Sequence, residues 1–338
     1  MIGDPRKHTV WYKQPTGPFA VAIYLVVRAV FAVMEVFPIN WNLQTARLLS
    51  KGWRLIMPKH YRRTVEHLTM TLGHQLPPEE IERMANACLE SVTMFAVEAI
   101  CLPRVVNALT LSRYVHLVNF DDLIRLTITG RGLILVTCHY GAFELPGHVL
   151  ACLGFDVCAV MRPMDNLYLN RFLVANRRTH GLTLLEKKGA SERAEDILRD
   201  GSMLAFIGDQ DAGRKGMFVE FFGRPASTYR SIGLLAMRTR SPIVIGYGRR
   251  MGQIAKYEVG VERIIYPEEW DAQADPLRWI TQTYTSAIEA VVRREPEQYL
   301  WIHRRWKSTP RRKSGVEMAV KGPRGDELEI DVAGEIAP

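Results

Sequence analysis

The spacing of hydrophobic residues changes along the chain, and each spacing predicts a different kind of structure. Residues 18–37 form a long, nearly uninterrupted apolar stretch. Between residues 43 and 108, apolar side chains recur every three or four positions, as on one face of a helix. The sequence PPEE at 77–80 is typical of a helix start, because proline fits the first turn and acids favour the N-terminal dipole. The first third of the chain is therefore predicted to be helical.

Beyond residue 131, short apolar runs of strand type alternate with helical stretches. Such alternation favours an α/β fold with a central, largely parallel sheet flanked by helices. The predicted strands are Gly132–Thr137, Asp156–Met161, Thr183–Leu185, Met203–Ile207, Ser241–Tyr247 and Tyr257–Val261, with helices from about Phe143 and over Ala190–Arg199.

Four parts of the chain differ in composition, and we expect them to differ in role. Residues 1–40 hold the apolar segment, and residues 41–110 form the helical region. Residues 111–307 form the α/β core. Residues 308–338 are charged and poor in large apolar residues, so they are expected to be a disordered tail.

The apolar stretch at 18–37 has the roughly 20 residues that a helix needs to cross a bilayer. Its two charges, Arg28 and Glu35, lie on about one helix face, and a charge at mid-bilayer is costly. Basic residues flank the stretch on both sides, so they favour no orientation. A helix that lies on one leaflet is therefore as compatible with the sequence as one that spans the bilayer, and we expect a membrane-associating helix that lies on one leaflet, on the cytoplasmic face. The alternative is a buried core helix with its charges paired.

Composition narrows the class of protein. The chain has 338 residues, of which 47% are hydrophobic and 24% charged, as in ordinary globular proteins. Its five cysteines show no CxxC spacing, so neither a disulfide framework nor a zinc ribbon is predicted, and we expect no metal or cofactor. The net charge of +8 favours polyanions, meaning nucleic acid or anionic lipid headgroups. Because no nucleic-acid-binding module is recognisable, a nucleic-acid partner is not expected.

Polar residues gather at the carboxyl ends of three predicted strands, where α/β sheets bind ligands. The chain has no GxSxG elbow, Walker loop or HExxH motif. The three sets are His139-Tyr-Gly-Ala-Phe-Glu144, Arg162-Pro-Met-Asp165-Asn166 and Gly208-Asp209-Gln210-Asp211.

His139 and Glu144 stand five positions apart, so the carboxylate can reach one imidazole nitrogen across a turn. That hydrogen bond would fix the tautomer and support the imidazolium that forms when the other nitrogen takes a proton. The pair predicts a general base for a hydroxyl or amine nucleophile, an effect of roughly 100- to 10,000-fold. The alternative is a turn-capping histidine before an ordinary helix-start glutamate. Cys138 is expected to face the other way and pack in the core.

In their order along the chain, these residues resemble the bacterial lipid A biosynthesis acyltransferases of lauroyl and myristoyl type, within the lysophospholipid acyltransferase superfamily. The likeness runs from the apolar helix to Lys307. The box HYGAFE lacks the tryptophan frequent before the acid, and Tyr299 replaces a usual tryptophan. The motifs are His139-x4-Glu144, Arg162-Pro-x-Asp165-Asn166, Arg177 followed by Gly181, Gly208-Asp209-Gln210-Asp211, Phe221-Phe222-Gly223 and the closing PEQYLWIHRRWK at 296–307.

The resemblance implies direct transfer of a fatty acyl chain from an acyl-carrier-protein or acyl-CoA thioester, without an acyl-enzyme. The acceptor it implies is a hydroxyl of an anionic glycolipid, a lipid A-type precursor, reached at the membrane surface. His139 becomes the general base, oriented by Glu144. Another envelope glycolipid or a lysophospholipid is the alternative acceptor. A non-catalytic protein that binds anionic membranes is a further alternative, but it leaves this pair without a role.

The resemblance also implies substrate-binding residues. Arg162, Arg177 and Arg230 are candidates for holding phosphate or supporting the oxyanion, because a guanidinium forks onto phosphate oxygens. Asp209 and its neighbour Asp211 are expected to anchor these arginines and the site loop, rather than to bind a metal. The aromatic residues Trp301, His303 and Trp306 are expected to pack a C-terminal strand onto the core.

Overall fold

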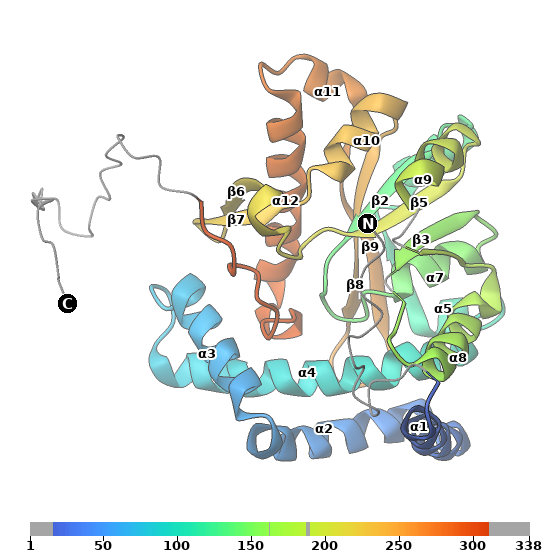
Figure 1. Cartoon of the computed structure of the whole chain (residues 1–338), viewed down its shortest axis with the longest axis vertical. Coiled ribbons are helices and arrows are strands. Elements are labelled where there is room, and N and C mark those ends of the chain that lie inside the picture. Colours follow the sequence, from blue (N-terminus) through green and yellow to red (C-terminus); the bar gives the residue numbers. More distant parts are fainter. Residues whose placement is uncertain (1–15, 162, 187–189, 311–338) are drawn as a thin grey trace, which may run out of the picture.

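The computed structural model describes residues 16–161, 163–186 and 190–310. Helices dominate the first third of the chain, and strands alternate with helices thereafter (Figure 1). The helices are α1 (Pro18–Val36), α2 (Ile39–Ile56), α3 (Pro58–Leu72), α4 (Pro78–Val105), α5 (Leu111–Tyr114), α6 (Asp121–Ile128), α7 (Leu145–Cys152), α8 (Leu167–Arg177), α9 (Ala190–Arg199), α10 (Ser231–Thr239), α11 (Pro267–Asp271) and α12 (Pro276–Arg294). The strands are β1 (Val115–Val118), β2 (Leu133–Thr137), β3 (Val157–Met161), β4 (Thr183–Glu186), β5 (Met203–Ile207), β6 (Met217–Phe221), β7 (Arg224–Thr228), β8 (Ile243–Arg250) and β9 (Tyr257–Ile265).

Seven strands form one sheet in the order β1-β9-β8-β2-β5-β3-β4. Neighbouring strands from β8 to β4 pair in parallel. β8 and β9 pair antiparallel, and β1 pairs in parallel with β9. The predicted α/β fold with a largely parallel sheet and a helical N-terminal region is therefore confirmed. The finer division of the chain at residues 40, 110 and 307 stays a prediction, and residues 311–338 of the expected tail lie outside the described residues.

All six predicted strands are present, but β1, β6 and β7 were not predicted. β6 and β7 form a separate antiparallel hairpin. Its two-residue turn, Phe222-Gly223, has positive φ at both positions (52° and 69°), which suits the twist of a tight hairpin. A bulky aromatic residue is uncommon in that conformation, so this turn is hard to see in the sequence.

The side chains of β2 alternate between two hydrophobic clusters, because successive residues of a strand point to opposite faces. Ile134 and Val136 pack with α10 and α12, whereas Leu133 packs in the cluster that contains α7. The long helix α4 contributes to both clusters. Figure 1 shows α4 beneath the sheet, at the same end of the molecule as α1 and α2.

Helix α1 is exposed along most of its length, which contradicts the alternative of a buried core helix. By length and composition both α1 and α4 could cross a bilayer, but 50% of the apolar window of α4 is buried, against 11% in α1. The contacts of α1 are largely with α8: Phe31 packs edge-on against Phe172, and the Arg28 guanidinium lies 4.5 Å from the centre of the same ring. The helix therefore presents an apolar surface suited to membrane association.

Candidate active site

His139 and Asp209 meet at the carboxyl ends of neighbouring parallel strands. β2 and β5 pair in a register that places Thr137 opposite Ile207, so both residues lie just beyond this last pair. Nδ1 of His139 lies 2.8 Å from Oδ1 of Asp209, and the backbone N–H of His139 donates to Oδ2 at 3.0 Å. Both side chains are buried, with residue exposures of 7% and 3%. Asp209 thus holds the imidazole and the start of the loop that carries it.

The charge of Asp209 fixes the tautomer of His139. A carboxylate can only accept, so Nδ1 carries the proton and Nε2 has a free lone pair. Nε2 has no hydrogen-bond partner in the described part of the chain. Burial acts to raise the pKa of Asp209, but the charge and the hydrogen bonds of His139 lower it to about 2. Asp209 therefore stays ionised and can support an imidazolium.

Glu144 does not make the predicted hydrogen bond to the imidazole, because Asp209 occupies that position. Glu144 stands at the N-terminus of α7 and forms a two-bond ion pair with Arg177 of α8. Nε of Arg177 lies 2.8 Å from Oε2, and Nη2 lies 2.5 Å from Oε1. Burial acts to lower the pKa of Arg177, but the hydrogen bonds and charge of Glu144 raise it overall. The Glu144–Arg177 pair is thus a second polar feature of the site.

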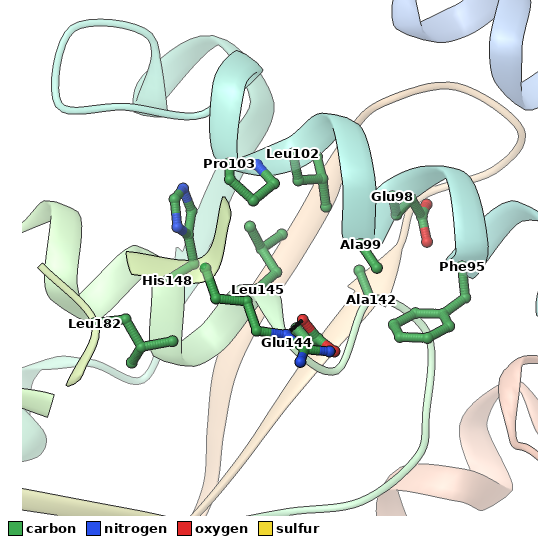
Figure 2. A pocket seen from close by; sticks show the side chains of 11 residues that line it. Phe95, Glu98, Ala99, Leu102, Pro103, Ala142, Glu144, Leu145, His148 and Leu182 are labelled. Carbon is green, nitrogen blue, oxygen red and sulfur yellow. Dashed lines mark hydrogen bonds and ion pairs between the residues drawn. The ribbon is translucent and has the colours of Figure 1, made fainter. Parts of the chain in front are cut away.

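The Glu144–Arg177 pair lines a pocket between α4 and α7 (Figure 2). Figure 2 shows Phe95 and Leu102 projecting from α4, with Leu145 and Leu182 among the residues around the pair. Most of the lining side chains are apolar. An ion pair in such surroundings is screened less than one on the surface, so each of its charges acts more strongly on nearby groups.

Phe143 connects this pocket to His139. Its ring stacks on Phe95, with centroids 4.2 Å apart, and meets the imidazole of His139 edge-on at 4.8 Å. This ring forms the aromatic wall between the imidazole and the pocket.

The turn after His139 requires a glycine. Gly141 has φ of +54°, and a Cβ there would come within 2.3 Å of the Gly248 carbonyl oxygen. The close approach lets the N–H of Ala142 donate to that oxygen at 2.8 Å. The turn therefore links the His139 loop to β8.

The C-terminal segment holds the other side of the same loop. The Gln298 carbonyl accepts from the N–H of Gly141, and the N–H of Leu300 donates to the His139 carbonyl, each at 2.9 Å. The predicted C-terminal strand is wrong: residues 296–298 form a 3₁₀ turn, followed by Tyr299, which makes an isolated bridge to Tyr140, and by further turns. The backbone hydrogen bonds of this segment are made within its own turns and to the His139 loop, and not along a strand, so no ladder forms.

His303, which was predicted from the sequence to pack in the core, lies beside His139. Trp301 is buried and Trp306 packs against the core as predicted, but the ring centre of His303 lies 4.4 Å from that of His139. Burial, and then the nearby charge of His139, lower the pKa of His303 to about 4. His303 is therefore neutral at pH 7.

The remaining predicted residues lie apart from this centre or outside the described residues. Arg162 lies outside them. Arg230 is exposed at the start of α10, and its guanidinium makes no hydrogen bond or ion pair within the described ranges. Asp211 accepts hydrogen bonds from Gly213 and Ser308, so it ties the C-terminal segment to the loop after β5. Cys138 is buried as predicted, and burial raises the pKa of its thiol. Among the described residues, no group of three or more His, Cys, Asp or Glu could hold a metal ion.

Comparison with known proteins identifies the family. Residues 17–308 match the family model described as bacterial lipid A biosynthesis acyltransferase. The lipid A biosynthesis palmitoleoyltransferase of Escherichia coli (strain K12) is 29% identical over 195 residues, 57% of this chain and 61% of that protein. The lauroyltransferase of the same organism is 24% identical over 202 residues, 59% of this chain and 64% of that protein. Lipid A biosynthesis acyltransferase 2 of Shigella flexneri is 21% identical over 283 residues, 82% of this chain and 87% of that protein.

The matched part spans less than two thirds of each of the two Escherichia coli enzymes. The family model, in contrast, covers the apolar helix, the His139 loop and the C-terminal segment in one continuous match. On this match, the chain belongs to the bacterial lipid A biosynthesis acyltransferase family.

Proposed function

We propose that this protein transfers a fatty acyl chain from an acyl-carrier-protein or acyl-CoA thioester to a hydroxyl group of an anionic glycolipid, a lipid A-type precursor. The observation that carries the proposal is the state of His139. Its Nδ1 is held by the buried Asp209 carboxylate, whereas Nε2 is left without a partner among the described residues. A buried imidazole held in this way is a general base.

Nε2 of His139 takes the proton of the acceptor hydroxyl as its oxygen attacks the thioester carbonyl carbon. The tetrahedral intermediate collapses, the carbon–sulfur bond breaks, and the departing thiolate takes the proton from Nε2. The products are an ester and a free thiol, and no acyl-enzyme forms. Asp209 stays ionised throughout and stabilises the imidazolium. His303 stays neutral beside His139, so it does not compete for the proton.

Glu144 acts on Arg177 in this scheme and not on the imidazole. Its carboxylate holds Nε and Nη2 of Arg177, which leaves Nη1 for the substrate. A guanidinium fixed at a pocket lined mostly by apolar residues can bind a phosphate of donor or acceptor, or support the oxyanion. Arg162 and Arg230 stay candidates for further phosphate contacts.

The proposed place of action is the cytoplasmic face of the inner membrane. The exposed apolar surface of α1 supports membrane attachment, and α1 packs on α8, the helix that carries Arg177. Acyl thioesters of carrier protein and CoA are water-soluble, so the donor reaches the site from the cytoplasm while the acceptor stays in the membrane.

The decisive experiment is acyl transfer by the purified full-length protein in detergent or vesicles. Carrier-protein and CoA thioesters are supplied in turn with a lipid A precursor, another envelope glycolipid or a lysophospholipid, and His139→Gln serves as the background. We expect ester formation with the lipid A precursor that depends on His139. Transfer only to another acceptor would overturn the substrate assignment. If no donor–acceptor pair gives turnover above background, the acyltransferase proposal fails and a non-catalytic membrane-binding role gains support.

A further inference from the structure

Helix α2 carries apolar side chains on two opposite faces, and only one of these faces is covered by the protein. The covered face packs in the core through Leu43 and Ala46, which lie in one cluster with residues of α4. On the other face, large apolar side chains are exposed. They are Trp41 (65% exposed), Leu48 (66%), Leu49 (68%), Leu55 (83%) and Ile56 (78%).

These exposed residues form one continuous stripe. Trp41, Leu48 and Leu55 are spaced by seven residues, and seven residues make almost two helical turns, so the three side chains nearly align. Leu49 and Ile56 widen the stripe on one side. Soluble monomers rarely expose so many large apolar side chains side by side, so we expect this stripe to be covered by a partner.

Positive charge borders the stripe. Lys51 and Arg54 are exposed on α2, and Lys59 is exposed just beyond it, on α3. The sequence of α2 contains no acidic residue. An apolar face flanked by cations fits the boundary between the acyl chains and the anionic headgroups of a bilayer. A water-soluble protein partner would match the apolar stripe but does not explain the bordering cations.

The stripe is continuous with the exposed surface of α1. Only Phe37 and Pro38 separate the two helices, and Nδ2 of Asn42 donates to the Met34 carbonyl at 2.7 Å, which fixes the corner between them. The ring of Phe37 stacks on Trp41, with centroids 6.1 Å apart, so the apolar surface passes from one helix to the next. Figure 1 shows α1 and α2 together at the end of the molecule below α4.

We infer that α2 lies in the plane of an anionic bilayer surface, with the Trp41–Leu48–Leu55 stripe in the acyl boundary and Lys51 and Arg54 at the headgroups. α1 and α2 then form one membrane-contacting surface. Because α2 packs on α4 and α4 lines the pocket, these two helices separate the surface from the site by about two helix diameters, roughly 20 Å. The inference rests on the membrane attachment proposed for α1, but not on acyl transfer.

The test uses the full-length protein and vesicles of phosphatidylglycerol and phosphatidylcholine, without any substrate. Lipids brominated near the headgroup end of their acyl chains quench tryptophan fluorescence, so wild type and Trp41→Phe are compared. We expect the brominated lipids to quench a larger share of the fluorescence in wild type than in Trp41→Phe, because only wild type has a tryptophan at position 41. Equal quenching in both proteins would show that α2 stays out of the bilayer and would overturn the inference.

Partitioning at limiting lipid gives a second measurement. Leu48→Glu/Leu55→Glu should lower the partition coefficient by at least about tenfold, because two apolar contacts with lipid are replaced by charges. Ile128→Glu is the matched control: Ile128 is 81% exposed but ends α6, just before β2 begins, at the end of the sheet away from α4. An unchanged partition coefficient in the double variant contradicts the inference. The inference is also contradicted if wild type is a dimer, the double variant is a monomer, and both bind vesicles equally well. Neither tryptophan quenching nor vesicle partitioning depends on acyl transfer, so a failure of the proposed activity does not change these two results.

Discussion

Asp209 and His139 are 70 residues apart in the sequence, yet the Asp209 carboxylate accepts two hydrogen bonds from His139, at 2.8 Å from Nδ1 and 3.0 Å from the backbone nitrogen. The contact exists because β2 and β5 are neighbours in the sheet. It places a buried anion on one nitrogen of the imidazole and leaves the other without a partner among the described residues. The polar residue that most directly holds the imidazole of His139 is therefore Asp209.

Asp209→Asn should lower kcat by roughly 1,000- to 10,000-fold with little change in KM. An amide can present its NH₂ group to Nδ1, which stabilises the wrong tautomer and removes the charge that supports the imidazolium. The measurement is steady-state kinetics of acyl transfer. Asp122→Asn, on the exposed start of α6, is the control. A variant at position 209 with more than about a tenth of wild-type kcat would contradict the assignment, given the usual size of general-base effects.

His139→Ala should remove nearly all turnover while the fold stays intact. The imidazole sits at the end of β2, and its hydrogen-bonded partner is Asp209. Loss of a general base lowers the rate by roughly 100- to 10,000-fold. Turnover is measured by ester formation, and folding by circular dichroism. Retention of more than about a tenth of the activity would exclude His139 as the base.

Glu144→Gln and Arg177→Lys should impair turnover less than Asp209→Asn, and their effects should not add. Each change breaks the same two-bond ion pair, so the double variant should resemble the worse single variant. If Arg177 binds phosphate, Arg177→Lys mainly raises KM for the phosphorylated substrate. If it supports the oxyanion, kcat falls instead.

These alternatives are separated by varying donor and acceptor concentrations independently. Arg125→Lys, whose side chain is 79% exposed on α6, is the matched control. Additive losses from Glu144→Gln and Arg177→Lys would show that the two residues act separately. Wild-type kinetics in both would leave the pair as a structural ion pair.

The sequence predicted which residues lie at the functional edge of the sheet, but not how they pair. His139 and Asp209 each follow a strand that was recognisable as a short apolar run, so their shared edge was predictable. Their contact depends on the strand order, which local patterns do not encode. Glu144 is close to His139 in sequence, but after the left-handed turn at Gly141 its carboxylate pairs with the guanidinium of Arg177 and not with the imidazole. Nearness in sequence was therefore a poor guide to the partner of the His139 imidazole.

The exposed stripe of α2 was missed for a related reason. An apolar residue looks the same in a sequence whether it faces a core or a membrane, so the periodicity of α2 indicates a helix but not what covers each face. His303 was assigned to packing because it lies between Trp301 and Trp306, which do pack in or against the core. Only the fold shows that the ring between them faces His139.

The lowered pKa of His303 predicts that the folded protein loses stability as pH falls from about 6.5 to about 4. The unfolded chain takes up a proton at position 303 near pH 6.5, whereas burial and the charge of His139 lower the folded-state pKa to about 4. Between these values the unfolded state binds more protons, so the free energy of unfolding decreases with pH, by at most about 3 kcal/mol from this group. The pKa of Asp209 is lowered to about 2, so this group decreases the free energy of unfolding only below about pH 4.

His303→Gln should therefore flatten the pH dependence of the free energy of unfolding between pH 7 and pH 5, measured by urea denaturation in detergent. The dependence should shrink but not vanish, because burial also lowers the pKa of His67 and this second histidine acts in the same direction. Comparing wild type and variant by their slopes removes any constant loss of packing that the glutamine causes. If His303→Gln keeps the full wild-type slope, the imidazole at position 303 is not held neutral by burial and the charge of His139.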